Sequence, residues 1–395
     1  MDPGSYMAVT NNEKRTTRPR EALILITVCV SLWIALGARL LPQARSTDFL
    51  NLYTGASFAL HWDWHDIYTE ARQLAREQKF VPERHELWPF VRPPVYAIIM
   101  APLALMPFSL AFWFWMSAQS AALLGCWAWA WKRFGPEAAV WSAFLIVGPV
   151  GIAHGQDSAL FLVLLCGAFV LGESERTFLC GLVLGLGLTK FHLFLMWPLV
   201  LLVQRRWRIF SGFAICGLGQ GLLSLAVLGW SGMRGYAKFI LHLDQYYSPD
   251  KNININAILL NLGMSSGPLL AVLTALVVGL VVWCARRTGR LWMTFTLATA
   301  GSLTIAPHVY SYDGTMFLLP ALCVIFLSTF RIARLAAATI CTPAVLIASI
   351  YGPPIQCLMA VALLVFVVAV CLESEPAATH SPAADGRKKA AHQAG

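Results

Sequence analysis

The chain has 395 residues, of which 58% are hydrophobic and only 12% are charged, and its mean hydropathy is +0.64. An ordinary soluble domain is about 25% charged, so this composition excludes a soluble globular enzyme, and the excess of apolar residues excludes a disordered chain. The net charge of +9 does not imply nucleic acid, because Lys and Arg gather in the cytoplasmic loops of membrane proteins. We therefore expect an all-α polytopic membrane protein with no nucleic-acid partner.

The N-terminal residues 1–21 are polar and predict a disordered cytoplasmic tail. The first apolar stretch, over about 22–41, is long enough to cross a bilayer of about 30 Å and longer than the core of a signal peptide, so we expect an uncleaved anchor. A long mixed outer loop follows over 42–108. Further apolar spans are expected at about 109–131, 137–153, 157–172, 177–189, 191–203, 208–230, 267–285, 291–306, 313–330, 334–350 and 354–372.

The resulting layout has about twelve spans, with both termini on one side. Basic residues test it, because loops rich in Lys and Arg stay in the cytoplasm. With the N-terminus inside, the tight basic pairs all fall on the inner face, among them Lys132-Arg133, Arg205-Arg206 and Arg286-Arg287. We therefore expect one transmembrane domain over 22–372 in the inner (plasma) membrane, a disordered cytoplasmic tail over 373–395, and a functional site that faces outward.

Polar residues at span ends are the informative ones, because they are costly in lipid. Asp48 directly follows the first span and is well placed as a base, although a solvated carboxylate or a helix cap is an equally simple interpretation. Four nearby residues also resemble a metal cluster. A metal site needs a second anchoring motif, which the chain lacks, so we predict none. The four residues are His61, Asp63, His65 and Asp66.

Further polar groups occur in later outer connections. Arg92 precedes two prolines and a short apolar stretch, where it either binds an anion or anchors at the headgroups. Lys190 lies between two short spans, where its charge requires either a bound phosphate as partner or a side chain that extends (snorkels) to the membrane surface. The remaining groups are Gln156-Asp157 in a tight turn, Asn252, Asn254 and Asn256 in the 231–266 loop, and His308, Tyr310, Tyr312 and Asp313 after Pro307.

The order of these motifs resembles the polyprenyl-phosphate-sugar-dependent glycosyltransferases of family 87, within the GT-C superfamily. The resemblance extends over about 22–330. It departs from the family at Phe191-His192, where a Pro often follows the Lys, and at the Pro307 turn, which has a single His. The matching residues are Asp48, Phe49, Tyr53, His65 to Tyr68, Pro93 to Tyr96, Pro102, Pro107, Gly155 to Asp157, Gly187 to Lys190, Pro198, Arg205 to Arg208, Pro307-His308 and Tyr312-Asp313.

The resemblance implies a GT-C-like helical bundle with amphipathic helices in the first outer loop. It also implies transfer of a hexose, often mannose, from a polyprenyl-phosphate donor to a lipid or glycan acceptor, with Asp48 as the catalytic base and no cofactor. A lipid-phosphate leaving group needs no general acid, so a single carboxylate suffices as base, and direct attack inverts the anomeric centre. Cationic groups must stabilise the departing phosphate, for which Lys190, His308 and Arg92 are the candidates. The expected substrate-binding residues are Tyr53, Asp66, Tyr68, Tyr96, Gln156, Asp157, Asn256, Tyr312 and Asp313.

Two other classes of membrane protein fit the same composition. A transporter or flippase of a lipid-linked or amphiphilic solute would also explain the spans and the polar residues, but it predicts inverted repeats, and the two halves of this sequence show no such symmetry. A ligase or oligosaccharyl-type transferase would act on a bulkier donor.

Overall fold

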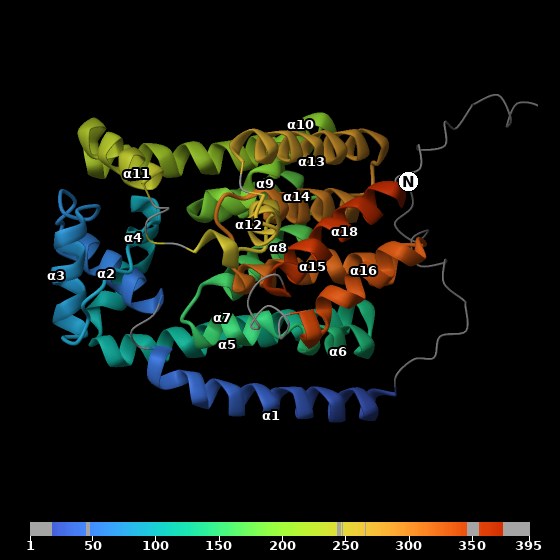
Figure 1. Cartoon of the computed structure of the whole chain (residues 1–395), viewed down its shortest axis with the longest axis horizontal. Coiled ribbons are helices and arrows are strands. Elements are labelled where there is room, and N and C mark those ends of the chain that lie inside the picture. The colour runs from blue at the N-terminus through green and yellow to red at the C-terminus, as the bar shows by residue number, and fades with distance from the viewer. Residues whose placement is uncertain are drawn as a thin grey trace, which may run out of the picture.

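A computed structural model describes residues 18–44, 48–242, 246, 248–264, 266–345 and 355–373 of the chain. Helices make up 82% of the structure, and the described residues contain no strand. The predicted all-helical class is therefore confirmed. Most of the two expected tails lies outside the described residues. Long helices run alongside one another as a bundle, and shorter helices close one of its ends (Figure 1).

The helices of the bundle follow the expected apolar spans closely. They are α1 (Pro19–Ala44), α5 (Phe108–Phe134), α6 (Pro136–Phe144), α7 (Val147–Ala153), α8 (Ser158–Glu173), α9 (Thr177–Leu186), α10 (Met196–Val203), α11 (Trp207–Leu241), α13 (Gly267–Arg287), α14 (Leu291–Ile305), α15 (Leu318–Leu327), α16 (Arg331–Cys341) and α18 (Leu358–Glu373). Short 3-10 segments complete it: η3 (Gly187–Phe194), η6 (Ser311–Phe317) and η7 (Ile355–Cys357).

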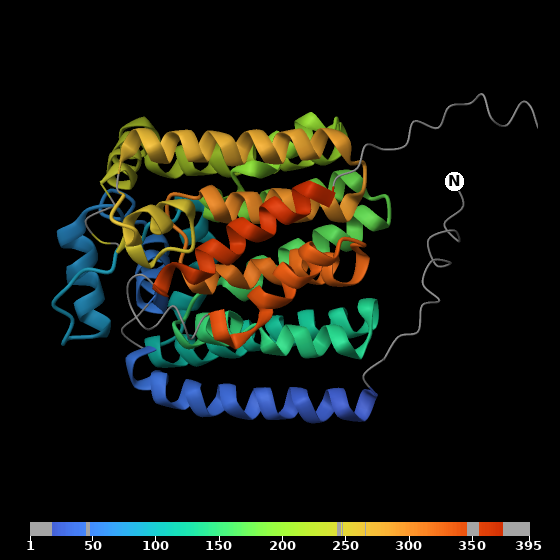
Figure 2. The ribbon, with the colours of Figure 1, turned by 45° about the vertical axis from the view of Figure 1, so that its right-hand side comes forward.

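Helices α2 (Asp48–Leu60), α3 (Glu70–Phe80) and α4 (Pro94–Met100), with η2 (Ala101–Leu105), form a cap at one end of the bundle (Figures 1 and 2). Helix α3 is amphipathic, with a polar outer face and Gln73 and Glu77 buried. Helix α2 differs from the expected amphipathic type, because all its residues from Asp48 to Ala59 are buried. It packs against α3, α4 and η2 and against the aromatic start of α5, which leaves it no solvent or lipid face.

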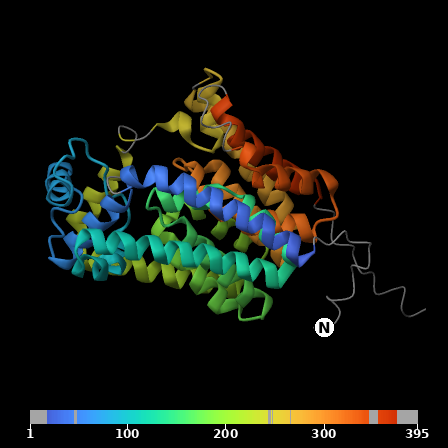
Figure 3. The same cartoon turned by 90° about the horizontal axis from the view of Figure 1, so that it is seen from below.

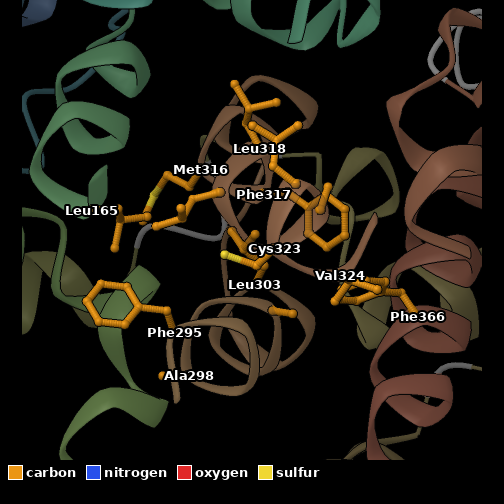
Figure 4. Close-up of a cluster of buried hydrophobic side chains, with 14 of the residues drawn as sticks. Leu165, Phe295, Ala298, Leu303, Met316, Phe317, Leu318, Cys323, Val324 and Phe366 are labelled. Carbon is orange, nitrogen blue, oxygen red and sulfur yellow. The ribbon is translucent and has the colours of Figure 1, made fainter. Parts of the chain in front are cut away.

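Helices α14 and α15 lie at the centre of the bundle. Apolar side chains from α8, α14, η6, α15 and α18 meet there (Figure 4), and the rings of Phe317 and Phe366 pack edge to face at 4.6 Å. All ten cysteines are free thiols and nine are buried, as expected of small apolar side chains. Helix α1 lies along the outside of the bundle (Figure 3), where Nε1 of Trp33 donates a hydrogen bond to the carbonyl of Ala143 at 3.0 Å.

Three segments of the described residues are long and apolar enough to cross a membrane: Thr177–Phe194, Trp207–Leu241 and Gly267–Arg287. Two bent pairs raise the number to five if each counts as one span, Pro94–Leu105 with Phe108–Phe134 (117°) and Pro136–Phe144 with Val147–Ala153 (52°). Four other apolar helices are shorter than 18 residues. The total of about twelve spans therefore stays a prediction, while the presence of several apolar helices is confirmed. The end of the expected span 334–350 lies outside the described residues.

The expected helix break at Lys190 is present: the helical segment Thr177–Phe194 is kinked there, because Lys190 leaves the helical conformation (φ −122°, ψ 52°). One expected boundary was wrong. Helix α11 does not end near 230. It continues to Leu241 across a kink at Gly229, whose φ of +64° favours glycine. The expected 231–266 loop therefore begins as helix, and its first residues reach the cap, where Tyr236 packs on Tyr68.

Tight pairs of basic residues, among them Lys132-Arg133 and Arg286-Arg287, mark the end of the bundle that is opposite to the cap. The guanidinium of Arg133 at the end of α5 lies 2.7 Å from Glu173 at the end of α8, and Arg206 before α11 donates to the carbonyl of Gly289 at 2.6 Å. The chain turns at this end after α5, α8, α10, α13 and α15, and at the cap end before α5, α8 and α15. The polar residues singled out in the sequence lie at the cap end.

Candidate active site

The turn between α7 and α8 brings Gln156 and Asp157 against the start of α2. Gly155 adopts a φ of +75°, and a Cβ at this position would lie 2.7 Å from Cβ of Phe49. Nε1 of Trp115 in α5 donates to the carbonyl of Gly155 at 2.9 Å and holds the turn in place. Because a side chain at 155 would push α2 away, the glycine allows Gln156 to approach Asp48.

Asp157 is the centre of a buried ion-pair network. Nη2 of Arg92 lies 3.0 Å from each of its carboxylate oxygens, Oη of Tyr96 donates to Oδ2 at 2.7 Å, and Nζ of Lys190 lies 3.0 Å from Oδ1. Burial raises the pKa of Asp157, but Arg92, Lys190 and Tyr96 outweigh it and lower the pKa to about 2. Asp157 is thus a carboxylate at neutral pH, and it joins α4 and η3 to the start of α8.

Lys190 joins this network to the turn after α14. Its Nζ lies 2.5 Å from Oδ1 of Asp313 and 3.5 Å from Oε1 of Gln156. Oδ2 of Asp313 accepts a hydrogen bond from the backbone N–H of Tyr310 at 3.2 Å and so caps η6. The Lys190 side chain is 4% exposed, so its charge is compensated by two carboxylates rather than by water.

Asp48 is the first residue of α2 and faces this network. Burial raises the pKa of its carboxyl group to about 6, although a hydrogen bond from Gln156 and the charges of Lys190 and Arg92 act in the opposite direction. A carboxyl group with a pKa near 6 is ionised at neutral pH and still basic enough to accept a proton. The pKa of Asp157 is lowered to about 2, so its carboxylate lacks that basicity. The two carboxylates therefore have different chemistry although they share their neighbours.

Asp48 opens onto a polar pocket between the cap and the bundle. The cap side contributes α2 and the segment before α4, and the bundle side contributes the turns at the ends of α7, α9 and α14. Burial, together with Lys190 and Arg92, lowers the pKa of His308 to about 4 despite the opposing charge of Asp313, so its ring is neutral at pH 7. The lining residues are Asp48, Asn51, Leu52, Trp88, Pro89, Val91 and Arg92 from the cap, and Gln156, Lys190, His192, His308, Tyr312 and Asp313 from the bundle.

The cap wall of the pocket is an extended segment over 88–92 whose backbone is held by side chains. Oε1 of Gln73 in α3 accepts from the N–H of Phe90 at 2.7 Å, Tyr236 in α11 donates to the carbonyl of Val91 at 3.2 Å, and Tyr68 donates to the carbonyl of Arg92 at 2.7 Å. A segment without secondary structure is thereby fixed in one conformation. The extension of α11 beyond Gly229 supplies one of these contacts.

The structure brings most of the predicted site residues together. Asp48, Arg92, Gln156, Lys190, His308, Tyr312 and Asp313 line the pocket, and Tyr96 and Asp157 lie in the network behind it. Four others lie elsewhere. The Tyr53 hydroxyl donates to the carbonyl of Met106 at 2.7 Å, and the Tyr68 hydroxyl is bonded to Arg92 as described. Oδ1 of Asp66 lies 3.8 Å from Nε of Arg72 on the exposed side of the cap. Asn256 is in α12 (Ile255–Asn261), outside the pocket lining.

Three of the four residues considered as a metal cluster, His61, Asp63 and Asp66, have other partners. Asp63 pairs with Arg76 at 2.5 Å, and Nδ1 of His61 lies 2.7 Å from the carbonyl of Ser57. Among the described residues, no group of three or more His, Cys, Asp or Glu side chains is arranged to hold a metal ion. The two remaining asparagines of the 231–266 loop are structural: Asn254 caps α12, and Asn252 accepts from the N–H of Val309 at 3.3 Å.

Six lining residues were not among the predicted site residues, and three of these have side chains that can donate hydrogen bonds into the pocket. Asn51 stands three positions after Asp48 and therefore on the same helix face, which is a signal that the spacing offered. His192 was noted in the polar stretch after Lys190 and as a departure from the family pattern, but it was given no role. Trp88, which is 39% exposed in the pocket wall, lies in a stretch with no motif of its own.

The bundle of apolar helices, with polar residues buried at one end, is typical of an integral membrane protein. Comparison with known protein families matches residues 90–310, more than half of the chain, to glycosyltransferase family 87. The chain therefore belongs to glycosyltransferase family 87 and is a membrane glycosyltransferase. The match begins after Asp48 and covers the residues from Arg92 to His308. No curated protein and no solved structure matches the chain.

Proposed function

We propose that the protein transfers a hexose, with mannose favoured, from a polyprenyl-phosphate donor to a hydroxyl group of a lipid or glycan acceptor. The observation that carries the proposal is the pocket itself, in which a carboxyl group with a raised pKa, Asp48, lies opposite Lys190 and two histidines. Membership of a glycosyltransferase family favours this reaction over the transporter or flippase that the composition also allowed.

The chemistry needs one base and no cofactor. The acceptor hydroxyl is held at the Asp48 carboxylate and attacks the anomeric carbon of the donor sugar from the face opposite the phosphate. The new C–O bond forms as the bond to the phosphate oxygen breaks, and the bonding electron pair leaves with the phosphate. The acceptor proton passes to Asp48. A single displacement inverts the anomeric centre, and the lipid phosphate departs without protonation.

The two cations set a condition on phosphate binding. Lys190 and Arg92 remain our candidates, but each already compensates a buried carboxylate. A phosphate at this position must therefore share these cations with Asp157 and Asp313, and it gains less from them than from free cations. Neutral hydrogen-bond donors, among them His308, become correspondingly more important.

The distribution of charge supports an outward-facing site. The tight basic pairs, among them Lys132-Arg133 and Arg286-Arg287, lie at the end of the bundle opposite to the cap, and such pairs stay in the cytoplasm. We infer that the pocket opens on the outer face of the plasma membrane and that both termini are cytoplasmic. Cysteine labelling of whole cells at exposed Leu105 in the cap and exposed Glu175 at the basic end tests this orientation. Only L105C should react with an impermeant maleimide, and the reverse pattern would contradict it.

A donor panel tests the reaction. The purified protein in detergent is given polyprenyl-phosphate mannose, polyprenyl-phosphate glucose and nucleotide sugars, and sugar transfer and the anomeric configuration of the product are measured. We expect turnover of a polyprenyl-phosphate sugar with inversion, and its loss in Asp48→Asn. Glu175→Gln, the same chemical change at an exposed carboxyl far from the pocket, should keep the parent rate. Turnover of nucleotide sugars alone would overturn the donor assignment.

A further inference from the structure

His192 is a pocket residue with one unsatisfied ring nitrogen. It follows the break at Lys190 in η3, and its side chain lines the pocket with Lys190 and His308. Its Nε2 atom is buried and has no hydrogen-bond partner. A buried polar atom without a partner costs free energy, and in a pocket such an atom is explained when a ligand supplies the partner.

The neighbours of His192 indicate what that ligand group is. The ring centroids of His192 and His308 are 6.1 Å apart, and Lys190 and Arg92 line the same pocket. The nearby carboxylates Asp157 and Asp313 are already paired with cations. Both cations and one N–H of each neutral imidazole can donate hydrogen bonds, so an anion, which accepts several hydrogen bonds at once, suits this position best.

We propose that Nε2–H of His192 donates a hydrogen bond to the phosphate of the polyprenyl-phosphate donor. This inference rests on the proposed function. His192 is then a catalytic residue, because it touches the oxygen atoms on which negative charge develops as the anomeric bond breaks. No proton is transferred, and the imidazole remains neutral. It contributes a donor that no carboxylate of the protein neutralises, unlike Lys190.

The break at Lys190 explains how Lys190 and His192, two positions apart, both reach one pocket. Side chains at i and i+2 point to different faces of a regular helix. The non-helical backbone of Lys190 (φ −122°, ψ 52°) changes the direction of the chain between them. Lys190 is thereby directed to Asp157 and Asp313, while His192 lines the same pocket.

The experiment measures binding of two matched lipids, a polyprenyl phosphate and the corresponding polyprenol, to the full-length protein in detergent. A hydrogen bond to a charged group contributes enough for a change of about 10- to 100-fold in Kd. We therefore expect His192→Phe to weaken binding of the polyprenyl phosphate by about that factor and to leave the affinity for the polyprenol unchanged. His192→Gln, which keeps an N–H near the position of Nε2, should restore part of the affinity.

Thermal unfolding of the lipid-free protein separates this role from a structural one. Replacing an unsatisfied polar atom with an apolar group of similar shape is neutral or stabilising, so the apparent Tm of His192→Phe should equal or exceed that of the parent. Parent affinity for the polyprenyl phosphate in His192→Phe would overturn the inference. So would an equal loss of affinity for both lipids that is accompanied by a lower Tm.

The outcomes also distinguish this inference from the proposed function. Suppose that the parent protein turns over a polyprenyl-phosphate sugar and that His192→Phe binds the polyprenyl phosphate with parent affinity. His192 then has no role in phosphate binding, and the proposed function still stands. If the parent protein neither binds a polyprenyl phosphate nor turns over a polyprenyl-phosphate sugar, the proposed donor class is wrong, and the inference about His192 is wrong with it.

Discussion

The ammonium group of Lys190 lies 3.0 Å from Oδ1 of Asp157, and both side chains are withdrawn from solvent. The same ammonium contacts Asp313, and the same carboxylate contacts Arg92. The two cations and two carboxylates therefore connect the cap to α8, η3 and η6. A break in this network would leave charges buried without compensation, so its first role is to hold the pocket together.

Replacing Lys190 by Met is expected to lower both stability and activity. Loss of one partner of a buried ion pair typically costs about 3–5 kcal/mol, so the apparent Tm in detergent should fall by several degrees and sugar transfer should be lost. Lys132→Met makes the same replacement at an exposed position at the basic end and should leave Tm unchanged. A Lys190→Met protein that unfolds at the parent temperature would show that the network is not structural.

The rate of transfer should depend on the ionisation of Asp48. Its raised pKa of about 6, caused mainly by burial, means that the base is protonated and inactive at low pH. The value of kcat/KM should therefore fall about tenfold per pH unit below pH 6 and level off above it. Gln156→Leu removes a hydrogen bond that favours the carboxylate, so the apparent pKa should rise and the profile should move to higher pH. A profile that is the same in both proteins would exclude Asp48 as the titrating base.

Gly55 of α2 is expected to tolerate no side chain. A Cβ at this position would lie 2.8 Å from Cγ of the fully buried Phe90 ring, in the segment that forms the cap wall. Overpacking of this kind costs about 1–3 kcal/mol, so Gly55→Ala should lower Tm and displace the wall. In α5, a Cβ added at Gly125 would have no atom within 4 Å, so Gly125→Ala should stabilise the protein by up to about 1 kcal/mol through its higher helix propensity. Equal Tm values for the two variants would contradict the packing described for α2.

Glu77 makes the stability of the cap dependent on pH. Burial raises its pKa from 4.5 to about 7, although Arg84 at 3.7 Å and the backbone of Trp88 favour the charged form. Because the folded protein binds the proton more tightly than the unfolded chain, the contribution of Glu77 is fully present below pH 4.5 and is lost as pH rises through 7.

Glu77→Gln cannot ionise and tests this dependence. The Tm of the parent relative to that of Glu77→Gln should decline between pH 5 and pH 8 when both proteins are measured in the same detergent and buffers. A difference that is constant across this range would mean that Glu77 titrates at its ordinary pKa. The comparison with the variant removes the contributions of other titrating groups, among them Asp48.

The sequence by itself determined the helical class, the positions of most helices and the residues worth attention. The reason is the bilayer, in which each apolar segment must satisfy its own backbone hydrogen bonds as a helix. Polar residues are then tolerated only at span ends or inside the protein, which is why Asp48, Arg92, Asp157, Lys190 and Asp313 stood out. Their types also indicated the chemistry, since a carboxylate and nearby cations suit sugar transfer from a lipid phosphate.

Only the tertiary structure decided the partners of these residues. Arg92 and Asp157 are 65 residues apart, and Lys190 and Asp313 are 123 residues apart, so no local pattern could pair them. Packing also placed α2 inside the cap and continued α11 past Gly229, where one backbone conformation carries the helix on to Tyr236. The wall at Trp88 and the unsatisfied nitrogen of His192 exist only because distant segments meet. Burial and contact are properties of the folded chain, because they depend on what surrounds a residue rather than on the residue itself.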